Sequence, residues 1–180
     1  SPNRDVNVDV VHDVPSECPS KFKIGVTNSD RNDGRNSQCA YGVKSVDLGA
    51  PGTSIFSTYP NNYYNYLSGT SMSSPHVTGA VAAMYAAACP RLAGDYKAYP
   101  DSLALIMKEY MLQGTDKIAS MKNRTASDGR LNLYKSFLEV ANYNCNNCNY
   151  NASIATNDNS CNLGSDGQAT LSVSGSLSNY

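Results

Sequence analysis

The chain has 180 residues, with 14 basic and 15 acidic side chains and a formal net charge of −1. This balance gives no electrostatic field that would favour nucleic acid or an anionic membrane as a partner. A hydrophobic content of 41% supports a folded core, and no apolar run approaches the ~20 residues of a membrane span. The length allows one domain and part of another.

Two apolar segments in the first part of the chain predict buried strands. They cover residues 22–27 and 43–48, and the polar run between them, NSDRNDGRNS (28–37), predicts a loop that turns at Gly34. Residues 58–66 (TYPNNYYNY) follow as an exposed connection rich in tyrosine. Strands of this kind, combined with the long helices described next, predict an α/β fold.

A serine opens the longest helix that the sequence predicts. From Met72 to Ala88 the residues are mostly small or apolar, which is typical of a helix buried on most of its faces. Gly69 permits a close backbone approach in front of it, and Pro75 loosens the first turn behind Ser71. Backbone amides at such a helix start would stabilise an oxyanion. Ser71 is therefore a candidate nucleophile, although serine also commonly caps a helix.

Two further helices are predicted downstream. Residues 101–113 (DSLALIMKEYMLQ) form an amphipathic pattern with Asp101 as the expected cap and Gly114 as the stop signal. Residues 131–140 predict a last helix.

The composition changes abruptly after Ala141. Residues 142–180 hold ten asparagines, three of the six cysteines and neither lysine nor arginine. Within them, residues 169–175 alternate like a half-buried strand. We expect a separate unit here, either the start of a small β-rich module or a disordered linker.

Six cysteines are many for a cytosolic enzyme of this size and fit an oxidising compartment. A zinc site at the CNNC sequence (145–148) cannot be closed locally because no histidine follows, so disulfide bonds are the expectation for the tail. The pairing stays open among 15 possibilities. The cysteines are Cys18, Cys39, Cys89, Cys145, Cys148 and Cys161.

Several segments together resemble one protein family. The sequence GTSMSSPHVTG (69–79) resembles the nucleophile signature of the subtilisin-like serine peptidases, the subtilases, with Ser71 in the nucleophile's position. Residues 46–55 (VDLGAPGTSI) resemble the strand and turn that precede this signature, and residues 15–27 resemble the entry to a core strand. Residues 129–133 are similar to the segment that closes many subtilase domains. The matches follow the family's order over residues 13 to 140.

The resemblance implies a fold and a reaction. Residues 1–141 would be the C-terminal part of a subtilisin-like parallel-sheet domain, followed by the β-rich or disordered tail. The implied reaction is hydrolysis of a peptide bond in a protein substrate through an acyl-enzyme on Ser71, with Gly69 and Thr70 beside the substrate. No cofactor is required for this chemistry. The alternative is a non-catalytic pseudopeptidase or binding module.

The family's chain order places the catalytic aspartate and histidine before the serine. We expect them, and the asparagine that completes the oxyanion hole, upstream of this chain, which would then be a fragment inactive on its own. His76 lies roughly 140° around the helix from Ser71 and is expected to face away from the hydroxyl group and to be packed. His12 is expected to be an exposed or hydrogen-bonded loop histidine.

Other properties follow from the resemblance less directly. Asp13 matches the segment that borders the primary specificity pocket, where a carboxylate would favour Lys or Arg, but a solvated loop acid or a neighbour of a calcium site is the alternative. The bond between Val14 and Pro15 is expected to be cis. Calcium would be structural, with ligands on loops such as residues 28–33 that the sequence does not fix. A secreted bacterial enzyme is expected, and the tyrosines of residues 58–66 fit either the leaving-group side of a cleft or a surface hairpin.

Overall fold

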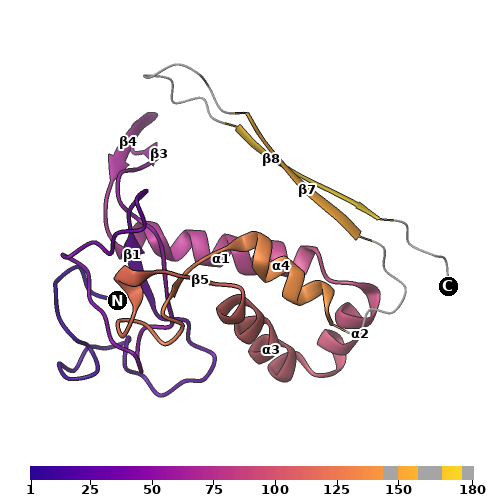
Figure 1. Cartoon of the computed structure of the whole chain (residues 1–180), viewed down its shortest axis with the longest axis horizontal. Coiled ribbons are helices and arrows are strands. Elements are labelled where there is room, and N and C mark those ends of the chain that lie inside the picture. Colours follow the sequence, from indigo (N-terminus) through magenta and orange to yellow (C-terminus); the bar gives the residue numbers. More distant parts are fainter. Residues whose placement is uncertain (144–149, 158–167, 176–180) are drawn as a thin grey trace.

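The computed structural model describes residues 1–143, 150–157 and 168–175, and Figure 1 shows its elements. Its centre is a four-stranded sheet in the order β1-β2-β6-β5. Strands β1 (Val26–Ser29) and β2 (Leu48–Pro51) are parallel, with Val26 opposite Leu48. Strand β6 (Gly129–Arg130) continues the parallel arrangement, and β5 (Asp116–Lys117) closes this side of the sheet in the antiparallel sense. The expected α/β class is confirmed.

Both core strands begin later than expected. Phe22 and Val43, placed in strands from the sequence, are 49% and 46% exposed. The backbones of these two segments first meet at Gly25. The Gly25 N–H donates to the Asp47 carboxylate at 2.6 Å, and the Gly25 carbonyl accepts from the Asp47 N–H at 2.8 Å. A Cβ at Gly25 would lie 2.2 Å from the Ser45 carbonyl oxygen, so only glycine fits this crossing. Phe22 and Val43, which precede the crossing, therefore lie outside the strands.

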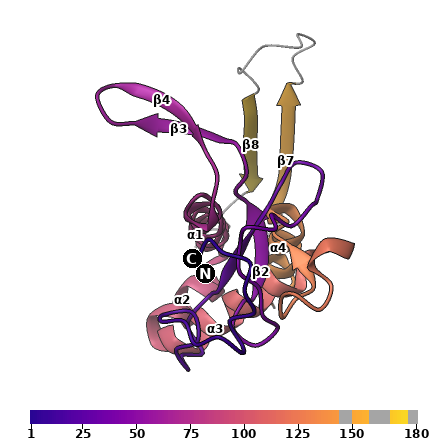
Figure 2. The same ribbon diagram turned by 90° about the vertical axis from the view of Figure 1, so that its left-hand side faces the viewer.

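In the described residues, four helices and one short 3₁₀ helix accompany the sheet. Figures 1 and 2 show how the helices lie beside it. They are α1 (Thr70–Ala86), α2 (Pro90–Ala98), α3 (Pro100–Gln113), α4 (Leu133–Ala141) and η1 (Ala119–Met121). Helix α1 packs on β1 and β2, while α3 and α4 pack against α1 and against each other. No helix in the described part of the chain is long and apolar enough to cross a membrane.

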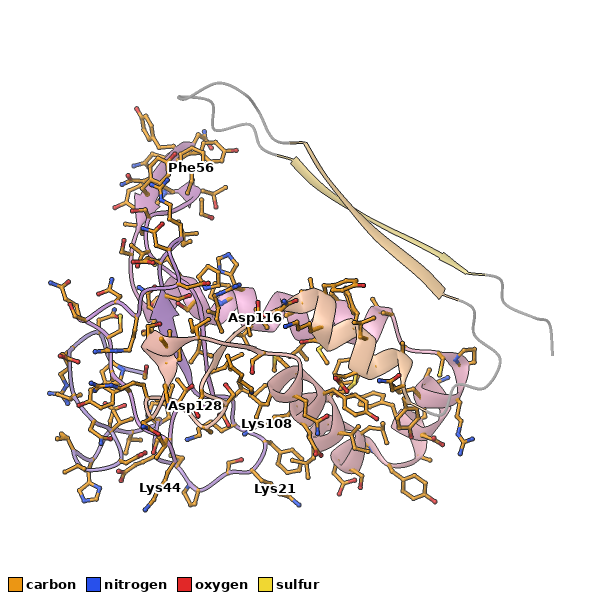
Figure 3. All side chains as sticks on the ribbon, in the orientation of Figure 1. Lys21, Lys44, Phe56, Lys108, Asp116 and Asp128 are labelled. Atoms are coloured by element: carbon orange, nitrogen blue, oxygen red, sulfur yellow. The ribbon has the colours of Figure 1, made fainter. Side chains whose placement is uncertain are left out.

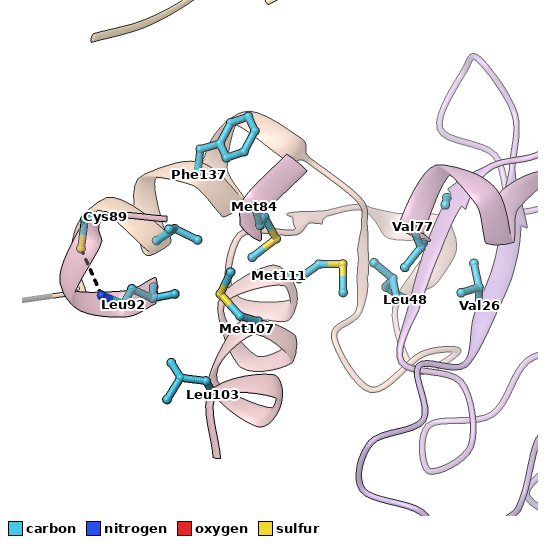
Figure 4. Close-up of a cluster of buried hydrophobic side chains, with 12 residues drawn as sticks. Val26, Leu48, Val77, Met84, Cys89, Leu92, Leu103, Met107, Met111 and Phe137 are labelled. Atoms are coloured by element: carbon cyan, nitrogen blue, oxygen red, sulfur yellow. Dashed lines mark hydrogen bonds between the residues drawn. The ribbon is translucent and has the colours of Figure 1, made fainter. Parts of the chain in front are cut away.

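The main core lies between the sheet and these helices (Figure 4). Leu48 of β2 and Met84 of α1 are fully buried, and they join Met107 and Met111 of α3 in one cluster. Burying each such side chain contributes about 1.5–3 kcal/mol to folding. Helix α1 is thus held at its centre by apolar contacts on the sheet side and on the helix side.

The helix ends differ in part from expectation. Tyr99, not Asp101, is the N-cap residue of α3, and Asp101 lies in the first turn, where the helix dipole favours a negative charge. Pro100 occupies the first helical position, which explains why the helix begins before Asp101. Gly114 is the C-cap residue, as expected. In α4 the Asn132 side chain caps the helix by accepting from the Lys135 N–H at 3.0 Å.

Two ionic groups tie helices to the sheet, and Figure 3 labels their central residues. The Lys108 ammonium group of α3 lies 2.9 Å from the Asp47 carboxylate. The Asp116 carboxylate accepts from Lys135 at 2.7 Å, from Asn132 at 2.9 Å and from Arg130 at 3.1 Å. The hydrogen bond from Lys135, followed by the contributions of its other partners, lowers the pKa of Asp116.

Residues 55–67 form a hairpin that projects from the body of the molecule (Figures 1 and 2). Strand β3 (Ile55–Tyr59) pairs antiparallel with β4 (Tyr63–Leu67), and the turn residues Asn61 and Asn62 have φ angles of 66° and 63°. The loop between the strands consists of Pro60, Asn61 and Asn62, and asparagine is one of the residues that tolerate a positive φ. The exposed connection expected here is confirmed and takes the form of a surface hairpin.

Strands also occur in the tail. Strand β7 (Tyr150–Asn157) pairs antiparallel with β8 (Gln168–Gly175), which confirms the strand expected at residues 169–175. Cys145, Cys148 and Cys161 lie outside the described residues, so disulfide bonds in the tail stay a prediction. The division into units 1–141 and 142–180 likewise stays a prediction.

Candidate active site

The start of helix α1 is fixed at the carboxyl end of β2. The Gly69 N–H donates to the Gly52 carbonyl at 2.8 Å, and the buried Ser73 hydroxyl group donates to the Ala50 carbonyl at 2.9 Å. A Cβ at Gly52 would lie 2.0 Å from the Ser73 hydroxyl oxygen, and Gly69 has a φ of 153° that favours glycine. These contacts place the first turn of α1 directly above the end of the strand.

Ser71 lies exposed in this first turn. Its hydroxyl group has no hydrogen-bond partner among the described residues. Around it, the Thr70 N–H donates to Asn3 at 2.9 Å, while the N–H groups of Met72 and Ser73 donate to the Gly69 carbonyl at 3.0 and 3.4 Å. The Ser71 N–H alone in this turn has no acceptor within the described part of the chain. An unpaired amide at a helix N-terminus attracts negative charge.

Asn3 is bonded to Thr70, the residue before this amide, although 67 positions separate the two residues. Its side-chain oxygen accepts from the Thr70 N–H at 2.9 Å and from the Thr70 hydroxyl group at 3.1 Å. Because donors occupy the oxygen, the amide nitrogen is the free end of the side chain. A Cβ at Gly69 would lie 3.0 Å from that nitrogen, and the Asn3 side chain is otherwise exposed. The turn thus carries the Ser71 hydroxyl group and N–H, and Asn3 is bonded to the neighbouring Thr70 with its NH₂ group left without an acceptor among the described residues.

Sequence reasoning missed Asn3. It expected an asparagine of this kind upstream of the chain, and nothing next to residue 3 in the sequence indicates its contact with residue 70. Only the fold brings the two segments together. The one available signal was that an asparagine precedes the family-like segments in the order that the resemblance requires.

Cys39 supports the Asn3 side chain from inside. Its thiol donates to the Asn3 oxygen at 3.7 Å and is 2% exposed. Burial raises the pKa of the Cys39 thiol, which keeps it in the neutral donor form. Cys39 and Cys18 are free thiols, and neither forms a disulfide bond. Both lie outside the tail, for which disulfide bonds are expected.

Neither histidine forms a hydrogen bond with Ser71. His76 is exposed, and its Nδ1 lies 2.8 Å from the Met72 carbonyl of its own helix. The expectation that His76 is packed is therefore wrong for the described residues, because no described element covers that side of α1. The His12 side chain is 89% exposed and lies 2.8 Å from Glu17, which confirms the hydrogen-bonded loop histidine.

Asp13 lies apart from this turn in the sequence and is half-buried. Its carbonyl accepts from the Glu17 N–H at 2.9 Å, which holds the loop around the cis bond between Val14 and Pro15. The expectation of a cis bond is confirmed. The pocket role of the Asp13 carboxylate stays a prediction.

The loop considered for calcium uses its own oxygens. The Asp30 carboxylate accepts from the N–H groups of Asn32 and Gly34 at 2.8 Å each, and Asp33 lies 2.6 Å from Arg130. Asn28 belongs to β1 and is buried. Within the residues described, no three carboxylate, histidine or cysteine side chains cluster as metal ligands. No calcium ligand is assigned.

Comparisons with known proteins agree with this geometry. The sequence model of the Subtilase family (Peptidase S8) matches residues 3–130. Thermitase from Thermoactinomyces vulgaris is 38% identical over 113 residues, which cover 63% of this chain and 35% of that protein. Subtilisin DY from Bacillus licheniformis is 44% identical over 68 residues, which cover 38% of this chain and 24% of that protein. The chain therefore spans about a third or less of these relatives.

A solved structure supports the fold. The Prenylagaramide maturation protease PagA superposes with a TM-score of 0.55 and 23% identity, over 71% of this chain and 44% of that one. At this identity the likeness shows the architecture alone. The family match includes both Asn3 and the Ser71 turn and covers most of the chain. The chain therefore belongs to the subtilase family of subtilisin-like serine peptidases.

Proposed function

We propose that the protein carrying this chain is a serine endopeptidase with Ser71 as its nucleophile. The observation that carries the proposal is the first turn of α1, where an exposed hydroxyl group lies next to an unpaired amide of the same residue. A hydroxyl nucleophile needs an adjacent site that accepts the negative charge formed on the substrate oxygen. One residue supplies both here.

In the proposed reaction the Ser71 oxygen attacks the carbonyl carbon of the substrate peptide bond. A histidine takes the serine proton, and the carbonyl electrons move to the oxygen. The oxyanion then accepts hydrogen bonds from the Ser71 N–H and the Asn3 NH₂ group. Collapse of this intermediate expels the amine, which receives the proton, and water later releases the acyl group by the reverse sequence.

The assignment to Asn3 replaces the expectation that the second oxyanion donor comes from outside the chain. The acid and base have no such replacement, because neither His12 nor His76 forms a hydrogen bond with Ser71: their bonds go to Glu17 and to the Met72 carbonyl. We therefore keep the proposal that a histidine and an aspartate from an upstream part of the same polypeptide complete the site, and that residues 1–180 alone are inactive. A protein or peptide outside the cell is the proposed substrate.

The decisive experiment is active-site labelling of the full-length protein. A fluorophosphonate probe should modify Ser71, as located by mass spectrometry, and Ser71→Ala should abolish both labelling and peptide hydrolysis. Ser74→Ala is the matched control, since Ser74 is exposed on the same helix turn and its carbonyl, not its hydroxyl group, bonds to Thr78. Labelling at another serine, or activity that survives Ser71→Ala, refutes the assignment. A folded protein without labelling or hydrolysis favours the pseudopeptidase.

Specificity for basic residues is a separate part of this proposal. If the half-buried Asp13 carboxylate lines the primary pocket, Asp13→Asn should reduce the preference for Lys or Arg over apolar residues by about 1–3 kcal/mol in transition-state discrimination. Hydrolysis of apolar substrates should change little. An unchanged ratio of kcat/KM values leaves Asp13 as a loop acid.

A further inference from the structure

A cavity of about 650 Å³ opens at the carboxyl edge of the sheet, beside the base of the β3–β4 hairpin. The ends of β1 and β2, the loop after β1, the hairpin base and Arg130 form its walls. The wall residue Ser54 donates its N–H to the Ser68 hydroxyl oxygen at 2.9 Å, and Ser68 belongs to the segment that leads into Ser71. A residue of the cavity wall is therefore hydrogen-bonded to the segment that precedes Ser71. Ser71 itself does not line the cavity.

Most charges in this cavity are already compensated. The Arg130 guanidinium group lies 2.6 Å from Asp33 and 3.1 Å from Asp116. One oxygen of the Asp30 carboxylate accepts two backbone N–H groups of its own loop. The exception is Arg31, which is exposed and has no ion pair or side-chain hydrogen bond within the described chain. Of the two cations in the cavity wall, Arg31 is therefore the one without an ion pair, while the Asp30 carboxylate is held by backbone N–H groups and not by a cation.

A second group in the cavity wall also lacks a partner. The Ser29 side chain is 0% exposed, and its hydroxyl oxygen has no hydrogen-bond partner in the described structure. A buried hydroxyl group without a partner carries a desolvation penalty, so such groups are rare in folded proteins. Ser29 lies at the end of β1 and lines the same cavity as Arg31. A ligand oxygen at this position would relieve the penalty.

We propose that this cavity is a subsite for an acidic side chain of the peptide substrate. The guanidinium group of Arg31 would pair with the carboxylate in the two-pronged manner that suits both groups. The Ser29 hydroxyl group would donate to the same carboxylate, and Tyr66 and Ile55 would cover the methylene groups of a glutamate. The inference rests on the proposed peptidase function and adds a substrate preference at a distance from the cleaved bond.

The test compares peptides that differ only by Glu or Gln at successive positions after the cleaved bond, with full-length protein. At one position we expect kcat/KM to be about 3- to 10-fold higher for the Glu peptide than for the Gln peptide, because a partly exposed ion pair contributes a free energy of this size. Arg31→Gln should remove this preference without lowering kcat/KM for the Gln peptide, Arg31→Lys should keep part of it, and Ser29→Ala should weaken it. Arg91→Gln, at an exposed arginine on α2, should leave it intact.

A binding measurement separates this proposal from the proposed reaction. The Ser71→Ala variant should bind a fluorescent Glu peptide about 3- to 10-fold more tightly than its Gln counterpart, and Arg31→Gln in that background should equalise the two. If peptides bind with this preference but are never cleaved, the peptidase proposal fails and the subsite stands. The subsite is refuted if Glu and Gln peptides have equal kcat/KM values or equal affinities at every position. It is also refuted if a preference for Glu survives Arg31→Gln.

Discussion

Helix α1 and the β3–β4 hairpin are neighbours in sequence, separated only by Ser68 and Gly69, yet they are built in opposite ways. Helix α1 buries Val77 and Met84 between the sheet and the other helices, whereas every residue of β4 is exposed. Both segments meet at the turn that carries Ser71. Helix α1 fixes the position of Ser71, the proposed nucleophile, and the hairpin leaves its side chains exposed.

The difference lies in which contacts hold each segment. Helix α1 is bound to β2 through Ser73 and to the core through its apolar face. The hairpin has its cross-strand bonds and a small aromatic stack, in which the Phe56 ring lies 5.5 Å from Tyr64 and 4.8 Å from Tyr66. Figure 3 shows Phe56 in the projecting hairpin, far from the ionic groups around Asp116. Stability should therefore depend on α1 and hardly on the hairpin.

The largest expected effect is a cavity in the core beneath α1. Met84→Ala removes a side chain that is 0% exposed and should lower the free energy of unfolding by about 2–5 kcal/mol, measured by urea denaturation. Phe56→Ala in the hairpin, at a residue 47% exposed, should cost about 1 kcal/mol through the lost stack. Equal losses for the two variants would show that the contrast between the segments is wrong.

The next effect concerns chemistry and not stability. Asn3→Ala should lower kcat of the full-length enzyme by about 10²–10³, with KM little changed, because it removes one donor to the oxyanion. Asn65→Ala is the control, since Asn65 is exposed in the hairpin and bonds only to the next backbone N–H. A change in KM with constant kcat would instead assign Asn3 to substrate binding.

A smaller effect is expected at the ionic group that joins β5, β6 and α4. Asp116→Asn should lower the free energy of unfolding by about 1–3 kcal/mol at pH 7, because it weakens charge-assisted bonds to Lys135 and Arg130.

The pH dependence follows from the lowered pKa of Asp116. The stabilisation is complete above the unfolded pKa of roughly 3.9 and is lost as pH falls through the lower folded value. Denaturation at pH 7 and near pH 3 should therefore show a difference between wild type and Asp116→Asn that shrinks in acid. A difference of constant size would assign the loss to shape and not to charge.

The smallest expected effect lies on the hairpin surface. Tyr63 is 68% exposed, and Tyr63→Thr keeps a residue that suits a strand, so the free energy of unfolding should stay within about 0.5 kcal/mol of wild type. If the hairpin contacts substrate, the same variant should change KM for long peptides while leaving short ones unaffected. A large loss of stability would show that Tyr63 packs against part of the protein beyond the described residues.

The sequence by itself determined the elements whose signal is local. The small residues after Ser71 predicted a long buried helix, Gly114 predicted a helix end, and the alternation at residues 169–175 predicted a strand, because each pattern depends on near neighbours in the chain. The family's motif around Ser71 also lies in one continuous segment, so it identified the candidate nucleophile.

Only the tertiary structure decided which distant residues meet. The contact between Gly25 and Asp47 makes both strands begin later than the sequence predicts, and the contact of Asn3 with Thr70 brings Asn3 to the turn that carries Ser71. The cavity around Arg31 likewise needs the ends of two strands, the hairpin and Arg130 in one place. Such contacts join residues far apart in the chain and depend on how the whole sheet packs, so no local pattern of residue types encodes them.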